Sequence, residues 1–141
     1  LISLGYTLLL YEIMSKIETE RMSPYCGILH TVRDGSPALC SDMMEEWRAV
    51  IVDSIVLSLI QGHEVTFDGF RVDHETGGVL LTDEAFHIFI RKYEKKMRSE
   101  SSYLSVSGRK SYRALLDEQV SMLARAIDNE DAKLYKAIRI R

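Results

Sequence analysis

The sequence predicts a mainly α-helical domain, bundle-like, with one short β-hairpin at about residues 69–81. Apolar residues recur at three- and four-residue intervals through most of the 141-residue chain, which is the spacing of one helix face. The exception lies at 70–81, where two short apolar runs flank a glycine-containing turn, a pattern typical of a hairpin. The chain length suits a single domain better than two.

Two helices are expected before the hairpin. The first covers residues 2–22, where apolar side chains repeat on one face and Pro24 follows. The second is predicted to be the longest and covers 37–62, with Ser36 as its cap and Gly62 just after its end. Its second half is apolar on nearly all sides, which indicates burial on more than one side.

Three helices are expected after the hairpin. One begins behind Thr82, a capping residue, and continues to about residue 98. A serine-rich linker follows at 99–108. The last two helices are predicted at about 109–128 and 130–139, where apolar positions again repeat on one face.

The composition is that of an ordinary soluble protein. The net charge is −3, so the total charge does not require a polyanionic partner. Two cysteines are too few for a disulfide framework and favour a reduced, cytoplasmic setting. The apolar opening run is interrupted by polar residues and falls short of the roughly 20 residues that a membrane span needs. Because the chain begins inside a helical pattern, we expect it to be part of a larger protein.

The side chains best suited to chemistry lie between residues 27 and 53. Asp42 and Glu45 are three positions apart on a predicted helix, so they share a face, and His30 lies in a loop that could fold over it. One imidazole with carboxylate oxygens suits Mg²⁺ or Mn²⁺, which support phosphoryl transfer. Taken alone, these residues are explained at least as well by a solvated helix face and a structural histidine.

The order of residues in this segment is more specific than the pair of carboxylates. The run GILHTVRDGSPALCSDMMEEWRAVIVD resembles the signature of the CRISPR-associated adaptation integrases, the Cas one family of nucleases. The residues at the positions of that signature are Gly27, His30, Gly35, Ser36, Asp42, Met44, Glu45, Trp47, Arg48, Val52 and Asp53. Segments 5–11 and 77–84 are also similar to the family, so the resemblance covers almost the whole chain. Glu46 and Trp47 depart from it, because the family often has proline and phenylalanine there.

The resemblance implies a metal-dependent DNA endonuclease and integrase of CRISPR adaptation. In that reaction a DNA 3′-hydroxyl attacks a phosphodiester of the CRISPR repeat, which inserts the protospacer as a new spacer. His30 and Glu45 would hold Mg²⁺ or Mn²⁺, and Asp42 would support them. The family's first ligand, a glutamate, should lie upstream of segment 5–11, with an N-terminal β-domain. Residues 1–141 are thus expected to be a single C-terminal helical domain with two of three metal ligands.

The resemblance also implies partners. The family acts as a homodimer joined to a dimer of a small adaptation protein, in a prokaryotic cytoplasm, on DNA and without a membrane. Basic side chains would supply sequence-independent affinity for DNA phosphates. Those predicted to do so are Arg48, Lys95, Lys96, Arg109, Lys110 and Arg113. A solvated helix face is the other explanation for each of them.

Three other interpretations fit parts of the sequence. The chain could be a non-catalytic DNA-binding or dimerisation module, inert because the third ligand is absent. A zinc site of Cys26, His30 and Cys40 has no paired-cysteine spacing and no fourth ligand. Ser36 near His30 could be a nucleophile, but helix capping explains it better.

Overall fold

The structure is a computed structural model that describes residues 1–29, 35–102 and 108–137. Its elements, in chain order, are α1 (Ile2–Thr19), α2 (Ala38–Glu45), the π-helix η1 (Arg48–Asp53), α3 (Ser54–Gln61), the 3₁₀ turn η2 (Phe67–Gly69), β1 (Phe70–Val72), β2 (Val79–Leu81), α4 (Asp83–Arg98), β3 (Glu100–Ser101), β4 (Lys110–Ser111), α5 (Tyr112–Asp128) and the 3₁₀ turn η3 (Ala132–Leu134). The predicted fold class, mainly α with a short hairpin, is confirmed. Among the described residues, no helix is both long enough and apolar enough to cross a membrane.

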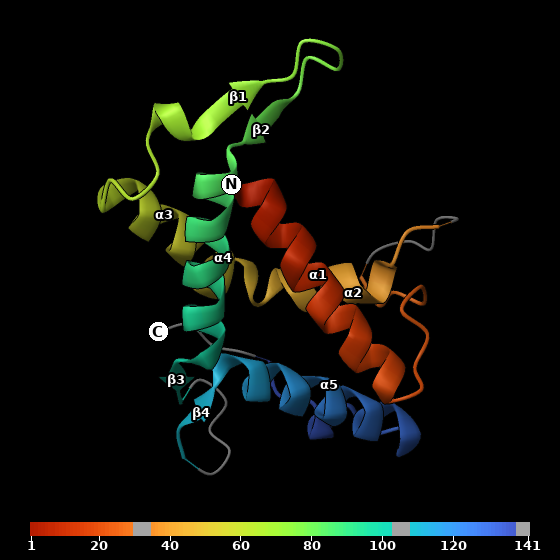
Figure 1. The fold of residues 1–141 in the computed structure, drawn as a ribbon. Coiled ribbons are helices and arrows are strands. Elements are labelled where there is room, and N and C mark those ends of the chain that lie inside the picture. The colour runs from red at the N-terminus through yellow and green to blue at the C-terminus, as the bar shows by residue number, and fades with distance from the viewer. Residues whose placement is uncertain (30–34, 103–107, 138–141) are drawn as a thin grey trace.

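The core forms where α1, α4 and α5 close around η1 (Figure 1). Helix α1 buries every fourth residue, Leu9, Ile13 and Ile17 among them, and α4 does the same with Phe89 and Tyr93. A four-residue repeat keeps side chains on one side of a helix, so each long helix presents one apolar stripe to the core. The predictions of amphipathic helices in these two segments are confirmed.

The predicted helix at 37–62 is interrupted, and Ser36 does not cap it. Pro37 occupies the N-cap position of α2, where no side chain forms a capping hydrogen bond. The α-helix ends at Glu45, a turn follows at residues 46–47, and six residues of π-helix precede α3. Such π segments are rare and lie frequently at functional sites. The interruption has a tertiary cause, because the side chains in the turn are bonded to α5.

The end of the chain also differs from the prediction. Over the described part of 130–139, only η3 is helical, and Glu130 has a positive φ of 52°. The backbone of Tyr135 is extended, and its hydroxyl donates a hydrogen bond to Glu46. This bond to a distant residue favours the extended conformation over the predicted helix. Part of the predicted linker at 99–108 is also ordered, since β3 pairs with β4 ahead of α5.

The predicted hairpin is confirmed and extends away from the helices (Figure 1). Strands β1 and β2 are antiparallel, with Phe70 opposite Leu81. In the turn, both carboxylate oxygens of Asp73 accept hydrogen bonds from within the turn. Thr82 caps α4 as predicted, because its hydroxyl oxygen accepts a hydrogen bond from the backbone N–H of Ala85.

Candidate active site

Glu45 is the last residue of α2, and its carboxylate lies at the surface. Its side chain is 46% exposed, and Oε1 accepts a hydrogen bond of 2.5 Å from Nη1 of Arg48. The Arg48 guanidinium lies 4.4 Å from the ring centroid of Tyr6, and the Tyr6 hydroxyl donates to Asp53 at 2.8 Å. This group of four side chains joins α1 to both ends of η1. A phosphate or a cation arriving there would meet Glu45 and Arg48 together.

Asp42 lies one turn before Glu45 but in a different environment. It is only 8% exposed, and its Oδ2 accepts hydrogen bonds from the backbone N–H groups of Ile28 at 2.5 Å and Leu29 at 2.8 Å. A carboxylate that accepts backbone N–H groups is a strong tether. Asp42 therefore holds the segment that leads into residue 30 against α2.

The described residues supply only part of the predicted metal site. His30 lies outside them, so its pairing with Glu45 stays a prediction. Within 1–29, 35–102 and 108–137, no three His, Cys, Asp or Glu side chains come together as a metal-binding group. A cation held by Glu45 would thus need further donors, and a carboxylate with an imidazole is a donor set that suits Mg²⁺ or Mn²⁺.

Cys26 and Cys40 do not lie in matching environments. Cys26 is exposed, whereas Cys40 is fully buried on α2. Burial raises the pKa of the Cys40 thiol to about 11, so the group stays protonated at neutral pH. A protonated, buried thiol is a poor zinc ligand, since zinc binds the thiolate.

A buried hydrogen-bond network surrounds the turn that follows Glu45. The indole N–H of Trp47 donates to the side-chain oxygen of Gln119, which is completely buried on α5. The Gln119 amide donates to Glu46 Oε2 and to the Tyr135 hydroxyl, each at 2.9 Å. The Tyr135 hydroxyl donates in turn to Glu46 Oε1 at 2.5 Å. The network fastens α5 and the end of the described chain to the helix that carries Glu45.

The sequence contained one indication of this network. Glu46 and Trp47 depart from the family pattern, and both form hydrogen bonds within the network. Proline and phenylalanine at these positions could form none of the side-chain bonds. Nothing in the spacing of Gln119 or Tyr135 connects them to that turn, so neither residue was predicted from the sequence.

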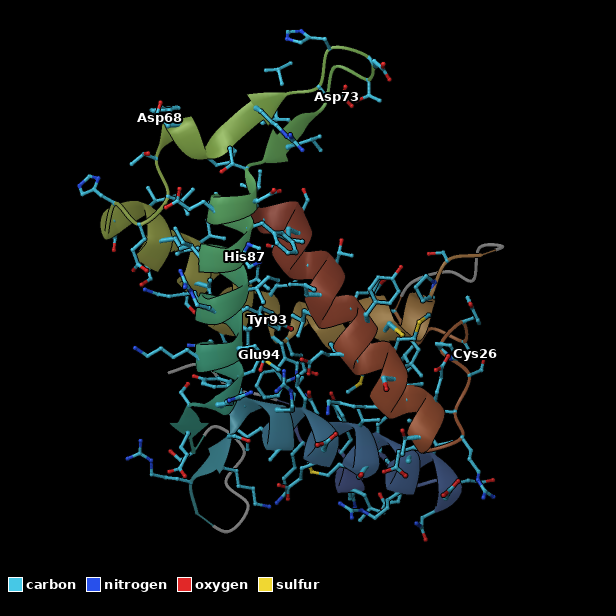
Figure 2. The ribbon with its side chains drawn as sticks, in the orientation of Figure 1. Cys26, Asp68, Asp73, His87, Tyr93 and Glu94 are labelled. Carbon is cyan, nitrogen blue, oxygen red and sulfur yellow. The ribbon has the colours of Figure 1, made fainter. Side chains whose placement is uncertain are left out.

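The six predicted DNA-binding cations have different surroundings. Arg113 is bound to both Glu12 and Glu94, at 2.5–3.2 Å, and Figure 2 shows Glu94 on the half of α4 nearest to α5. Lys110 pairs with Glu118 at 2.7 Å. These two cations hold helices together.

The remaining predicted cations also differ from one another. Arg48 is paired with Glu45. Lys96 lies over the ring of Tyr112, with its Nζ 4.5 Å from the centroid. Lys95 and Arg109 are exposed, and no carboxylate pairs with either of them among the described residues. Contact of all six with DNA stays a prediction, but the geometry favours Lys95 and Arg109 over Arg113 and Lys110.

The family model described as CRISPR associated protein Cas1 matches residues 1–95, well over half of the chain. The chain belongs to the Cas1 family. It is 38% identical over 130 residues to the CRISPR-associated endonuclease Cas1 3 of Thermus thermophilus, covering 92% of this Cas1 chain and 39% of that relative. It is 35% identical over 129 residues to the CRISPR-associated endonuclease Cas1 of Mycobacterium tuberculosis, covering 91% and 38%. The chain thus spans about two fifths of these relatives' length.

Solved structures share the fold of this Cas1 chain. A structure titled "Casposase bound to integration product" matches 95% of the chain and 38% of its own, with a TM-score of 0.83 and 20% identity. The structure titled "Cas6-RT-Cas1--Cas2 complex" matches 100% of the chain and 15% of its own, with a TM-score of 0.82 and 24% identity. At these identities the likeness concerns the fold alone.

Proposed function

We propose that this chain is the helical part of a metal-dependent DNA endonuclease and integrase of CRISPR adaptation. The protein would insert new spacers through attack of a DNA 3′-hydroxyl on a phosphodiester of the CRISPR repeat. Membership of the Cas1 family and relatives named endonucleases support the proposal. Because the chain spans about two fifths of those relatives, the activity is proposed for the whole protein, and this chain would carry part of its site.

One observation supports the proposal at the level of particular residues. Asp42 accepts the backbone N–H groups of Ile28 and Leu29, so the residues immediately before His30 are held against α2, the helix that ends at Glu45. This supports His30 and Glu45 as neighbours that could share one ion. It also gives the expected supporting role of Asp42 a form, since its Oδ2 accepts two backbone N–H groups. Asp42 would support the two ligands by positioning the segment that leads into His30.

Within this mechanism His30 and Glu45 would hold Mg²⁺ or Mn²⁺, with a glutamate from sequence outside this chain. The bound ion would polarise the phosphodiester and lower the pKa of the attacking hydroxyl. Arg48, which pairs with Glu45 in the structure, would supply positive charge to a phosphate beside that carboxylate. Its stacking on Tyr6 would hold the guanidinium there.

The proposal extends to the assembly of the protein. We expect a homodimer that joins a dimer of a small adaptation partner on protospacer and repeat DNA, in a prokaryotic cytoplasm. The solved complex whose title names Cas1 with Cas2 supports this assembly, and the casposase title, which names an integration product, supports an integration reaction.

The decisive experiment compares the 141-residue chain with a longer chain that includes the upstream glutamate. We expect the longer chain to bind Mn²⁺ and to nick or join DNA, and the shorter one to bind Mn²⁺ more weakly. Glu45→Gln and His30→Ala in the longer chain should each lower the rate by at least roughly 100-fold. Glu84→Gln, an exposed glutamate at the start of α4, is the matched control. If the longer chain neither binds Mn²⁺ nor cleaves or joins DNA, the catalytic proposal fails.

The second candidate is a non-catalytic DNA-binding or dimerisation module. It is favoured by one observation, that Lys95 and Arg109 are exposed and pair with no carboxylate among the described residues. This candidate predicts DNA binding or dimerisation that does not change with Mn²⁺ and survives Glu45→Gln. The longer chain of the same experiment separates the two candidates, because only the enzyme gains activity with metal.

A further inference from the structure

Helix α4 carries a row of cations that the proposed metal site does not use. Arg91, Lys95 and Arg98 are four and three positions apart, so they lie above one another on the same side of the helix. Lys92 and Lys96 lie beside that row. Two of the five are neutralised by carboxylates, since Lys92 pairs with Glu64 and Arg98 pairs with Glu94 at 3.4 Å.

Arg91 and Lys95 have no such partner among the described residues. Both are exposed, and neither side chain forms an ion pair or a hydrogen bond with a described residue. Two consecutive turns of α4 therefore present uncompensated positive charge, about 6 Å apart along the helix axis at 1.5 Å per residue.

Cations of α4 border a groove that lies between α3 and α4. One hollow of about 380 Å³ is lined by Lys92, Lys95 and Lys96 of α4 together with serines of α3, and none of the described acidic residues lines it. Two further hollows continue along α4 and are bordered by Arg91 and Lys95, with Glu64 in one and Glu94 in the other. Within the first hollow Ser54 and Ser99 donate to backbone carbonyls, whereas Ser58 is exposed and its hydroxyl has no hydrogen bond among the described residues. Ser58 can therefore donate to a ligand.

A structural explanation covers only part of this arrangement. Cations in the last turn of a helix stabilise its dipole, which accounts for Lys95, Lys96 and Arg98. It does not account for Arg91, which lies further from the helix end, nor for serines of α3 that line one hollow together with Lys95. Positive charge beside hydroxyl donors is the lining that a row of phosphates requires.

We propose that the α3–α4 groove binds the sugar–phosphate backbone of a nucleic-acid strand, with Lys95 at its centre, Arg91 beside it and Ser58 as a hydroxyl donor. The strand is the DNA on which the proposed integrase acts, so the identity of the ligand rests on the proposed function. The contacts are to phosphates, and the groove therefore binds without preference for sequence.

The test measures binding of a fluorescent DNA duplex to the 141-residue chain in EDTA, at several salt concentrations. The double variant Arg91→Gln with Lys95→Gln should weaken binding roughly tenfold at low salt and reduce the slope of log K against log salt by about 1.8, the value for two lost phosphate contacts. Arg21→Gln with Arg125→Gln removes the same charge from exposed positions on α1's end and α5, and should leave the slope close to that of the parent chain. Ser58→Ala should weaken binding without changing the slope.

Two outcomes overturn the inference. One is an equal loss of affinity and slope in both double variants, because only total charge would then matter. The other is a double variant Arg91→Gln with Lys95→Gln that binds DNA as well as the parent chain does but no longer binds vesicles containing phosphatidylserine, because the groove would then bind a lipid surface. The binding test is run in EDTA and does not depend on metal, whereas the proposed reaction is tested by Mn²⁺-dependent nicking. Either one can therefore fail while the other succeeds.

Discussion

The indole N–H of Trp47 donates a hydrogen bond to the side-chain oxygen of Gln119, 72 residues further along the chain. Gln119 is completely buried and also donates to Glu46 and Tyr135. A single side chain thus joins α5 to the turn that immediately follows Glu45. The position of a proposed metal ligand depends in this way on a residue far from it in sequence.

Replacing Gln119 should be costly although the residue touches no ligand. Gln119→Leu keeps the volume but leaves the Trp47 N–H and the Glu46 carboxylate short of buried partners. We expect the free energy of unfolding in urea to fall by roughly 2–4 kcal/mol. Trp47→Phe should then cost much less in the Gln119→Leu chain than in the parent. Additive losses in that double-mutant cycle would contradict the Trp47–Gln119 bond.

Asp42 should control the segment that leads into residue 30. Asp42→Ala removes the acceptor of the Ile28 and Leu29 backbone N–H groups, and their hydrogen exchange should accelerate by roughly tenfold or more. Asp128→Ala, at the exposed end of α5, is the control and should leave both amides unchanged. Exchange at Ile28 and Leu29 that is equally slow in both variants would show that another group holds the segment.

The bridge from Arg113 to Glu12 and Glu94 should make stability depend on pH. Hydrogen bonding to Arg113 lowers the pKa of Glu94 below its ordinary value of 4.5. The unfolded chain therefore takes up the proton first, so this stabilisation is complete above about pH 4.5 and is lost as the pH falls through the folded-state pKa.

Arg113→Gln removes that linkage. The variant should lose roughly 1–2 kcal/mol of unfolding free energy at pH 7, with most of the difference from the parent disappearing in acid. Urea denaturation at pH 7 and below pH 4 measures both values. Lys110→Gln, which breaks the single pair with Glu118, serves as a control with a smaller effect. A loss in Arg113→Gln that is the same at both pH values would exclude the bridge as its cause.

Gly5 should tolerate no side chain. A Cβ there would collide with Cγ1 of Val52 and lie 3.2 Å from Cζ of Phe89, because α1 packs directly on η1. Gly5→Ala should therefore destabilise the chain by about 1–3 kcal/mol, although alanine is the better helix former. Ser3→Ala, on the exposed side of α1, should be neutral or slightly stabilising. A higher melting temperature for Gly5→Ala would mean that α1 and η1 are less tightly packed.

Local patterns in the sequence determined much of this fold. The four-residue repeats of α1 and α4, the Thr82 cap and the hairpin at 70–81 all depend on residues within a few positions of one another. The ordered family signature in turn singled out Glu45 and His30, although the structure describes only Glu45. Local interactions are readable from sequence because the chain itself keeps the partners close.

Tertiary structure decided where those patterns fail. The break after Glu45 and the extended conformation of Tyr135 depend on a network whose members are up to 89 residues apart. The same is true of the cations, because only the folded chain shows that Arg113 is bound by two carboxylates, whereas Lys95 is paired with no carboxylate in the described part of the chain. Buried hydrogen bonds to charged groups contribute roughly 1.5–3 kcal/mol each, more than most residues differ in helix propensity, so distant contacts prevail over local preference.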